Sequence, residues 1–545
     1  MRIVVQQLNL KIGDLHKNTS KIIDAIERAK AARANIILFS ELTICGYPPE
    51  DLVLQNTFIA AIDEYLQKIV AVSQNIMVVV GLPRLNLFQG EKHLFNSACI
   101  ICDRKIMGFY DKMLLPHYDI FNERRYFEPG EQVYVCSYMG KKIGVIICED
   151  IWQHSGHVSL TRYEKDPILE LKKYHIDLLL NLSASPYQFQ KPDIRCEVCA
   201  TAAKTLNCPV ILCCQVGGND QLLFDGYSIY VNKEGNLGAI AKGFKEDEMI
   251  INLEDPISTF PLTYNPIHDL YYALVMGVRD YFYKQNFSQA IIGISGGIDS
   301  ALASCIAVDA LGKSNVLGVT MPSRYSPAES IQDARDVAHN LGISLDTISV
   351  EKIFQLFLEE LNPYLDEKYR GITEENIQAR LRGNILMALS NDLGRLVLNA
   401  SNKSELAIGY ATLYGDMCGG LSILGDVLKT QVYELADWVN REKGTLIPHH
   451  IINKPPSAEL RLNQKDSDTL PDYSTIDIVL QAYVEDYLHS SQISKKYDID
   501  IGVILDIIKK IHAAEYKRRQ FPPILRVSKK SFNIGRRYPI VQGWI

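Results

Sequence analysis

The chain has 545 residues, of which 47% are hydrophobic and 22% are charged, and these values exclude a single small domain and a disordered chain. Its 57 basic residues against 64 acidic ones give a net charge of −7, which favours neither a nucleic-acid nor a membrane partner. No apolar run is long enough to span a bilayer and the N-terminus lacks signal-peptide character, so we expect a cytoplasmic protein.

The first 250 or so residues alternate short apolar runs with helical patterns, which is typical of an α/β fold. A helix is expected around Lys17–Ala34, and NKEG at 232–235 predicts a hairpin turn. The strand-like runs are RIVVQQLNL, NIILFSE, NIMVVVGLP, SACIICD, KKIGVIICED, IDLLLNLSAS, CPVILCCQVGG and GYSIYVN. This number of strands predicts a sandwich of sheets covered by helices.

Twelve cysteines in a chain of this length are too few for a disulfide scaffold. Two CxxC pairs, Cys99/Cys102 and Cys196/Cys199, raise the alternative of a zinc site. Residues three apart in a strand point to opposite faces, which argues against zinc at the first pair, and no histidine-rich segment follows. We therefore expect free thiols.

Three prolines, Pro256, Pro261 and Pro266, lie within eleven residues before a helical pattern resumes at Asp269–Tyr283. We place the domain boundary there, with one domain at 1–255 and the other at 256–545. The second domain again alternates strand-like and helical segments, which predicts a doubly wound parallel sheet. Ligands bind such sheets at the carboxyl ends of the strands.

The segment IIGISGGIDS at 291–300 leads from an apolar strand through a Gly/Ser loop into a helical run. Such a loop holds phosphate through backbone N–H groups, hydroxyls and the positive end of the helix. It is neither a Walker A motif nor a dinucleotide GxGxxG, and an ordinary glycine-rich turn is the alternative. A carboxylate in an anion loop is repulsive unless it serves a cation, so we assign Asp299 to Mg²⁺.

SGGxDS after a strand resembles the pyrophosphate loop of the N-type ATP pyrophosphatases. Further blocks resemble NAD synthetase: NASNKSE (399–405), GYATLYGD (409–416), LKT (428–430), KPPSAEL (454–460) and KRR (517–519). The resemblance implies a set of ATP contacts: Gly293, Ile294, Ser295, Gly296, Gly297, Ile298, Asp299, Ser300 and Ala400. It places deamido-NAD at Asn376, Glu405 and Lys517, with Glu405 also a candidate Mg²⁺ ligand.

The chain departs from that family's pattern at Asn399-Ala400-Ser401, where Ala-Thr-Gly is common, so a threonine hydroxyl contact to ATP is missing. After Glu515 every charged residue is basic. This basic segment is either a solvated tail or an anion site. Deamido-NAD would supply a pyrophosphate and a carboxylate to pair with Lys517 and its arginine neighbours.

Three residues in the first half, Glu41, Lys112 and Cys148, each end or follow a strand-like run. A thiol attacks an amide as thiolate, a carboxylate takes and returns the proton, and an ammonium stabilises the oxyanion. The alternatives are a buried structural thiol and ordinary ion-pair members. Together these residue types predict an amidase site.

The order Glu, Lys, Cys, with KMLLP (112–116) and YFEPG (126–130), resembles the nitrilase superfamily. That resemblance implies an N-terminal nitrilase-like α-β-β-α sandwich beside the C-terminal doubly wound ATP pyrophosphatase domain. Its glutaminase members hold glutamine at positions that match Tyr118, Ser185 and Lys191. Glu149, next to Cys148, either has a structural role or orients the site.

Over its whole length the chain resembles the glutamine-dependent NAD synthetase family. The resemblance implies that ATP adenylates deamido-NAD with release of pyrophosphate, and that ammonia from glutamine displaces AMP to give NAD⁺. Because ammonia is mostly protonated in neutral water, we expect an enclosed passage between the two sites. A homo-oligomer that binds only small molecules is expected.

Two alternatives stay open. The first is another amidotransferase of the pyrophosphatase type, such as a GMP or asparagine synthetase; the asparagine type would have a cysteine at position 2, where this chain has Arg2. The second is a non-catalytic nucleotide-binding protein with a decayed site. The intact candidate residues argue against decay: Glu41, Lys112, Cys148, Ser295, Asp299 and Glu405.

Overall fold

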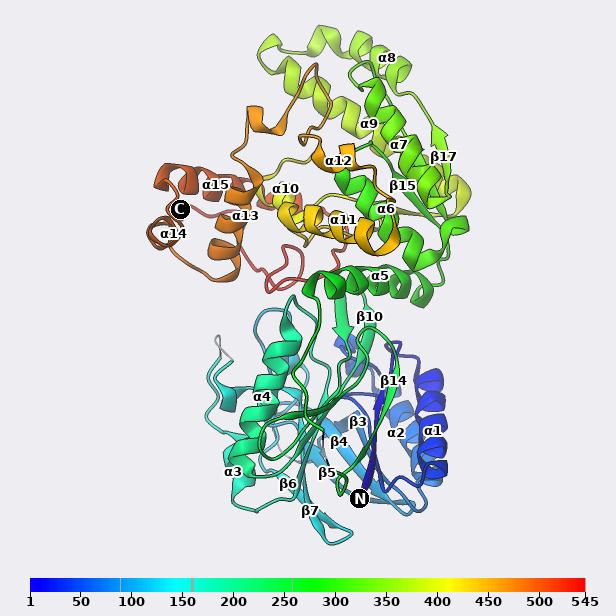
Figure 1. Cartoon of the computed structure of the whole chain (residues 1–545), viewed down its shortest axis with the longest axis vertical. Coiled ribbons are helices and arrows are strands. Elements are labelled where there is room, and N and C mark those ends of the chain that lie inside the picture. The colour runs from blue at the N-terminus through cyan, green and yellow to red at the C-terminus, as the bar shows by residue number, and fades with distance from the viewer. Residues whose placement is uncertain (89, 158–160, 257, 545) are drawn as a thin grey trace. The chain divides into compact units, whose positions relative to one another are not determined.

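The computed structural model of the chain describes residues 1–88, 90–157, 161–256 and 258–544 (Figure 1). It divides into two compact units, Met1–Pro266 and Ile267–Ile545, so the division falls at the end of the proline-rich stretch. Within the described residues, no helix is both long and apolar enough to cross a membrane.

The N-terminal unit contains two six-stranded sheets, with the strand orders β14-β1-β2-β3-β4-β5 and β13-β12-β9-β8-β7-β6. The strands of the first sheet are β1 Arg2–Gln7, β2 Ile36–Leu38, β3 Met77–Leu85, β4 Leu94–Cys102, β5 Lys105–Asp111 and β14 Asp247–Asn252. Those of the second are β6 Tyr134–Tyr138, β7 Lys141–Ile147, β8 Leu178–Ser183, β9 Val210–Cys214, β12 Ile229–Val231 and β13 Leu237–Ile240. A separate ribbon pairs β10 Val216–Asn219 with β11 Leu222–Asp225.

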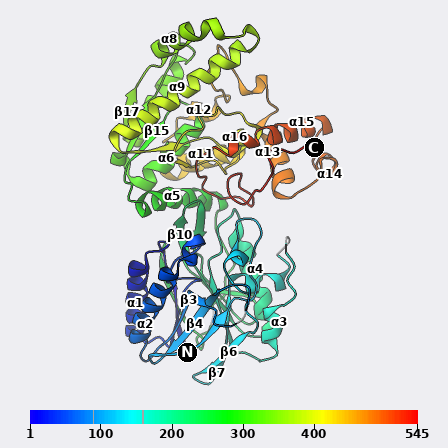
Figure 2. The same ribbon diagram turned by 180° about the vertical axis from the view of Figure 1, so that it is seen from behind.

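Parallel pairing explains why the central strands are apolar throughout. β7, β8 and β9 are parallel neighbours, and every residue of β8 and β9 is buried, because one face meets the other sheet and the opposite face meets helices. Helices α1 Leu15–Ala31 and α2 Asn56–Val72 lie together on one side of the unit, and α3 Pro167–Lys172 and α4 Lys191–Leu206 on the other (Figures 1 and 2). The predicted sandwich is confirmed.

The turn at 232–235 joins β12 to β13, which pair antiparallel, so the predicted hairpin is confirmed. The first helix begins at Leu15, where the Asp14 side chain accepts a hydrogen bond from the backbone N–H of Lys17. It ends at Ala31, earlier than expected, because Arg33 has a left-handed backbone with φ +56°.

The C-terminal unit is built on a parallel sheet with the order β17-β16-β15-β18-β19. Its strands are β15 Ala290–Gly293, β16 Val316–Thr320, β17 Ser344–Thr347, β18 Leu396–Asn399 and β19 Leu421–Ser422. From β15 the chain adds strands on one side and then returns to add β18 on the other. This reversal is the topological switch point at which doubly wound sheets bind ligands, and the predicted fold class is confirmed.

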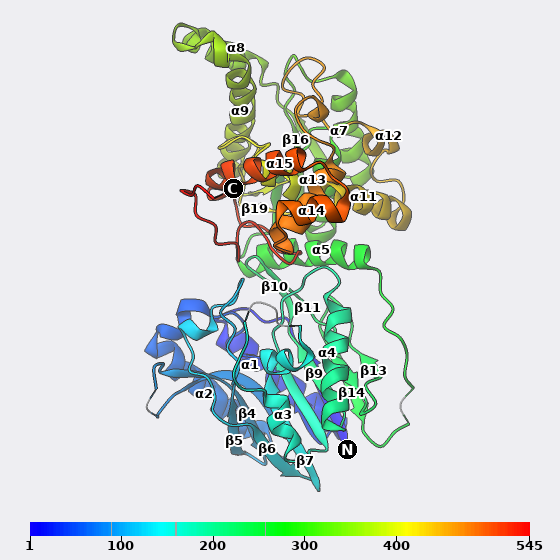
Figure 3. The ribbon, with the colours of Figure 1, turned by 90° about the vertical axis from the view of Figure 1, so that its left-hand side faces the viewer.

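Helices surround this sheet, and Figure 3 shows α8 and the start of α9 extending away from it. Their bounds are α5 Pro266–Lys284, α6 Ile298–Leu311, α7 Ala328–Leu341, α8 Glu351–Leu361, α9 Arg370–Leu393, α10 Lys403–Ile408, α11 Lys429–Lys443, α12 His449–Asn453, α13 Tyr473–Leu480, α14 Ser490–Tyr497, α15 Ile501–Ala513 and α16 Glu515–Arg518. The two loops at the switch point lead from β15 into α6 and from β18 into α10, so both carry residues of the predicted ATP site.

The basic segment after Glu515 is largely internal. Arg518 and Arg536 are buried, and both pair with the Glu515 carboxylate. Arg518 also donates hydrogen bonds to the carbonyls of Leu406 and Ala407 at 3.0 and 2.7 Å. For these two arginines the alternative of a solvated tail is excluded, because Glu515 and backbone carbonyls satisfy their charge inside the fold.

Candidate active sites

Glu41, Lys112 and Cys148 come together in the N-terminal unit. Lys112 follows β5 and Cys148 follows β7, while Glu41 lies three residues beyond β2. Lys112 Nζ lies 2.6 Å from Glu41 Oε1, and both side chains are fully buried. Electrostatic interactions connect the Cys148 thiol with both of them. Residues more than 100 positions apart in sequence thus share one buried site.

The Cys148 backbone is left-handed, with φ +43°, at the turn from β7 into the short 3₁₀ helix Cys148–Ile151. Such a conformation is costly for a residue with a side chain and tends to persist at functional sites. The Cys148 N–H donates to Asn181 Oδ1 at 2.9 Å, and the Ser183 hydroxyl donates to the sulfur at 3.4 Å. These contacts fix the position of the sulfur.

Burial raises the pKa of the Cys148 thiol well above its usual value, and the Glu41 charge adds to this, although Lys112 opposes both. The thiol is therefore protonated at rest and needs a base before it can act as a nucleophile. Burial also disfavours the charged form of Lys112, but Glu123 and Glu41 outweigh it and raise its pKa. Lys112 thus remains an ammonium.

Glu123 is a site residue that the sequence did not reveal. Its carboxylate accepts hydrogen bonds from Lys112 Nζ at 2.8 Å and from the Tyr47 hydroxyl at 2.9 Å, and burial raises its pKa to about 7. Asn96 Nδ2 donates to Glu41 at 2.8 Å and lies 3.4 Å from Glu123. In the sequence Glu123 precedes two arginines and looks like a surface charge, so no local signal distinguishes it.

Asp150 supports the turn that carries Cys148. Its carboxylate accepts hydrogen bonds from the N–H groups of Leu114 and Ile147, both at 2.9 Å, and from the Tyr110 hydroxyl at 2.7 Å. Burial nevertheless raises the pKa of Asp150 from 3.8 to about 7. Folding therefore favours the protonated acid, and the stabilisation it gives at low pH is lost as the pH rises towards 7.

We expect the N-terminal unit to become less stable, and its unfolding temperature to fall, between pH 4 and 7. Asp150 contributes up to about 1.4 kcal/mol per pH unit to this loss of unfolding free energy. In Asp150→Asn that contribution is absent, so the slope is shallower, whatever the loss of absolute stability. Thermal unfolding at several pH values measures the slope. Asp24→Asn, an exposed change on α1, is the control; equal slopes in all three proteins would contradict the prediction.

Two of the three predicted glutamine contacts, Tyr118 and Lys191, interact with Glu149, the residue next to the nucleophile. The Tyr118 hydroxyl donates to Glu149 Oε1 at 2.8 Å, and Tyr163, which the sequence did not reveal, donates to the same oxygen at 3.1 Å. Lys191 Nζ lies 5.1 Å from the centre of the Trp152 ring and lowers the pKa of the Glu149 carboxyl, which burial raises. Ser185 is buried two residues beyond β8.

In the C-terminal unit a cavity of about 340 Å³ lies at the carboxyl ends of β15, β16 and β18. This is within the usual range for a small-molecule site. The predicted residues that line it are Gly293, Ile294, Ser295, Gly297, Ile298, Asp299, Ser300, Ala400 and Glu405. Gly296 does not line it: its left-handed backbone, φ +85°, is pressed against the backbone of Ser330.

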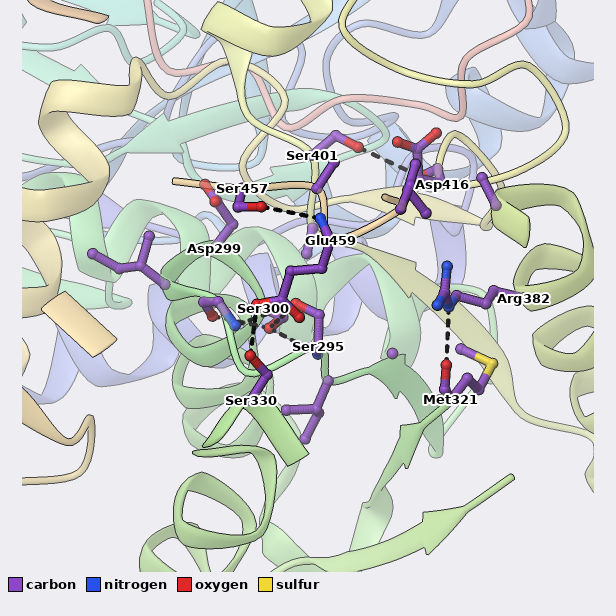
Figure 4. A pocket seen from close by; sticks show the side chains of 18 of the residues that line it. Ser295, Asp299, Ser300, Met321, Ser330, Arg382, Ser401, Asp416, Ser457 and Glu459 are labelled. Atoms are coloured by element: carbon purple, nitrogen blue, oxygen red, sulfur yellow. Dashed lines mark hydrogen bonds between the residues drawn. The ribbon is translucent and has the colours of Figure 1, made fainter. Parts of the chain in front are cut away.

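Hydroxyls and amides gather in the loop after β15 (Figure 4). Ser295 Oγ lies 3.2 Å from Ser300 Oγ and accepts from the Gly297 N–H at 3.3 Å. Beside the loop, the Ser330 hydroxyl donates to Glu459 at 2.6 Å, and Lys454 Nζ donates to both of these side chains. Lys454, with three donors, lies within reach of a phosphate chain in this cavity.

Asp299 and Glu405 face one another across Lys429, whose Nζ lies 2.5 Å from Asp299 and 3.2 Å from Glu405. Asn402 Nδ2 also donates to Asp299 at 2.9 Å. Burial raises the pKa of Glu405 to about 7. Lys429 belongs to the predicted LKT block, but its residue type alone assigned it no role. Among the described residues, no three His, Cys, Asp or Glu side chains come close enough to hold a metal ion.

Asn376 and Lys517 lie outside the lining of the cavity but meet at one loop. The Thr412 hydroxyl donates to Asn376 Oδ1 at 2.8 Å, and Lys517 Nζ donates to the carbonyls of Gly409 and Ala411, both at 2.8 Å. Thr412 N also donates to Asp416 Oδ1 at 2.6 Å, and Asp416 lines the cavity. This loop therefore connects the cavity to the two predicted deamido-NAD residues.

The model of the NAD synthase family matches residues 270–521, and that of the carbon-nitrogen hydrolase family matches residues 2–255. A glutamine-dependent NAD(+) synthetase of Synechocystis sp. is 42% identical over 99% of both chains, and one of Thermotoga maritima is 38% identical over 99% of this chain and 98% of its own.

A solved structure, that of a glutamine-dependent NAD+ synthetase from Acinetobacter baumannii in complex with ADP, covers 100% of this chain and 99% of its own, with 36% identity and a TM-score of 0.77. The similarity spans both units and both candidate sites. The chain belongs to the glutamine-dependent NAD(+) synthetase family.

Proposed function

We propose that this chain makes NAD⁺ in two coupled stages, with the N-terminal site releasing ammonia from glutamine and the C-terminal site using it. One observation carries the proposal, which is that a single chain holds two sites of complementary chemistry. The first is a buried thiol beside a lysine that pairs with two carboxylates, and the second is a cavity lined by a Gly/Ser loop at the switch point of a parallel sheet. The family relationship supports this pair of reactions.

Cys148 is the nucleophile of the first stage. Glu41 takes the thiol proton as the sulfur attacks the amide carbon, and Lys112 stabilises the negative charge that develops on the amide oxygen. When the C–N bond breaks, Glu41 returns the proton to the leaving ammonia. Water then hydrolyses the thioester to glutamate. The raised pKa of Cys148 supports this order, because its thiolate forms only with a base.

Tyr118, Ser185 and Lys191 hold the amino-acid end of glutamine. The pairing of Tyr118 with Glu149, next to the nucleophile, supports this assignment because it provides a carboxylate for the substrate ammonium group. Lys191, with its positive charge, suits the substrate carboxylate. Ser185 adds a hydroxyl.

In the second stage residues 293–300 and Ala400 bind ATP. The cavity these residues line supports the assignment, and Gly296 holds the loop in place from behind. Asp299 and Glu405 fit Mg²⁺, which takes one or two protein carboxylates and completes its shell with substrate phosphates and water. When bound, Mg²⁺ neutralises the charge of the departing pyrophosphate. Lys429, held between these carboxylates, adds a fixed positive charge.

Deamido-NAD binds at Asn376, Glu405 and Lys517, with its nicotinate carboxylate reaching the cavity. Adenylation makes that carboxylate electrophilic, so ammonia can displace AMP.

The domains that do this are 1–255 and 256–545. We place the enzyme in the cytoplasm as a homo-oligomer whose ligands are small molecules, with no nucleic-acid or membrane partner. The free state of the cysteines in the described chain agrees with a reducing compartment.

The test is a product assay with deamido-NAD, ATP, Mg²⁺ and glutamine labelled with ¹⁵N in its amide. We expect ¹⁵N-labelled NAD⁺, AMP and pyrophosphate in equal amounts. Unlabelled ammonium at the same concentration tests the enclosed passage: the label in NAD⁺ stays undiluted if ammonia does not equilibrate with solvent. If no NAD⁺ forms from either nitrogen source, the proposed function is wrong.

Replacing Glu123 with glutamine is expected to lower kcat for glutamine hydrolysis about 100-fold, because one of the two charges that position Lys112 is lost. Synthesis from ammonium chloride should not change. Glu128→Gln is the matched control, since Glu128 accepts hydrogen bonds from the Glu91 and Lys92 N–H groups and does not contact Lys112. Equal effects of both changes would show that Glu123 has no special role.

A further inference from the structure

Tyr414 is an exposed aromatic residue on the loop Gly409–Asp416, which connects the ATP cavity to Asn376 and Lys517. It is 64% exposed, whereas Thr412 and Met417 on either side of it are 7% and 2% exposed. Its backbone is left-handed, with φ +63°. A tyrosine rarely adopts this conformation, and such residues cluster at ligand sites because the surrounding structure must impose it.

The surrounding structure does impose it. A Cβ built on Gly383 of α9 would lie 2.9 Å from the carbonyl oxygens of both Tyr414 and Gly415, and one built on Gly415 would lie 2.9 Å from Ala379. The loop and the helix therefore touch backbone to backbone. Arg380 of the same helix donates to the Leu413 carbonyl at 3.1 Å. The contacts with α9 thus hold the backbone of Tyr414 in place.

The groups around Tyr414 suit a charged nucleotide. Its hydroxyl donates to Gln520 Oε1 at 2.5 Å, which anchors the far end of the ring. Arg380 and Lys517 are close enough to interact electrostatically, and Lys517 interacts in the same way with Asp416. Gly415 and Asp416, directly after the tyrosine, line the cavity. Tyr414 therefore lies directly before two residues that line the cavity, on a loop whose carbonyls accept hydrogen bonds from Arg380 and Lys517.

We propose that Tyr414 is the surface on which the nicotinate ring of deamido-NAD stacks. The inference rests on the proposed function, which requires the nicotinate carboxylate to meet the ATP α-phosphate inside the cavity. The ring of that substrate is a planar pyridinium cation, and the π face of tyrosine attracts such cations. Asp416, two residues farther along the loop, adds negative charge, while Arg380 and Lys517 supply positive charge for the phosphates of the dinucleotide.

The first test compares Tyr414→Ala and Tyr414→Phe with the full-length wild-type enzyme. We expect alanine to raise KM for deamido-NAD about tenfold, as loss of a stacked aromatic ring does elsewhere, with KM for ATP unchanged. Phenylalanine keeps the ring and should stay within twofold of wild type. Tyr487→Ala is the matched control, because Tyr487 is also exposed (59%) and has φ +56°, but its neighbours, unlike Gly415 and Asp416 after Tyr414, do not line the cavity.

The second test asks which ring stacks, using NAD⁺ and NADH as competitors of deamido-NAD. They share the adenine half and differ in the nicotinamide ring, which is cationic and planar in NAD⁺ and neutral in NADH. Wild type and Tyr414→Phe should bind NAD⁺ more tightly than NADH. Tyr414→Ala should lose this preference. Equal weakening of both competitors would instead place the adenine on Tyr414 and overturn the proposal.

An unchanged KM in Tyr414→Ala would also overturn it, as would an equal effect of Tyr487→Ala. Thermal unfolding of each variant separates a binding effect from a folding defect. Failure of the inference differs visibly from failure of the proposed function. In the first case wild type makes NAD⁺ and only the Tyr414 result fails, whereas in the second wild type makes none.

Discussion

Replacing Cys148 with alanine is expected to remove the use of glutamine while leaving the use of ammonium chloride intact. Without the sulfur no thioester forms, so glutamine-dependent NAD⁺ formation should fall by a factor on the order of 10³ or more. The synthetase site receives ammonia from solution and keeps its rate. The measurement is NAD⁺ and AMP formation with each nitrogen source, for wild type and variant.

Cys99→Ala is the control for this change. Cys99 is a fully buried thiol on β4, and its replacement alters packing without touching Glu41, Lys112 or Cys148. We expect it to keep glutamine use near the wild-type level. Normal glutamine use by Cys148→Ala would rule out the assigned nucleophile. Loss of both nitrogen sources would show that the change damages the whole protein and not one site.

Replacing Gly296 with alanine is expected to reduce NAD⁺ formation from both nitrogen sources by about 100-fold or more, while glutamine hydrolysis persists. The added Cβ would lie 2.9 Å from the Ser330 Cα and closer still to its carbonyl oxygen. Backbone cannot move aside as a side chain does, so the loop that cradles the phosphates must shift. ATP-dependent pyrophosphate release in the presence of deamido-NAD measures the loss.

Gly312→Ala separates the clash from the cost of the backbone conformation. Both glycines have φ +85°, but a Cβ on Gly312 meets nothing within 4 Å. Alanine there should cost stability of about 1 kcal/mol and leave synthesis near normal. If the two alanine variants lose activity equally, the contact with Ser330 does not explain the effect.

Several features of this protein follow from the sequence because they are local. Strand-like runs ending in Glu, Lys and Cys predicted where a nucleophile and its partners lie, and the structure brings Glu41, Lys112 and Cys148 together. IIGISGGIDS predicted a strand, an anion loop and a helix, and the chain forms β15, the loop and α6 there. Each of these signals occupies a few consecutive residues, so pattern and residue type suffice to read it.

Other features were decided by tertiary structure, because their partners are far apart in the chain. Glu123 looked like a surface charge until the fold brought it 2.8 Å from Lys112. Lys429 belongs to a motif that the sequence shows, but only the fold places its ammonium group against Asp299, 130 positions away in the chain. Composition could not choose between a solvated tail and an anion site for the basic segment, and buried Glu515 pairs with Arg518 and Arg536. Sequence determined which residue types are present and on which local elements; only the fold decided which charges share a buried site, because burial makes each charge depend on its nearest partner.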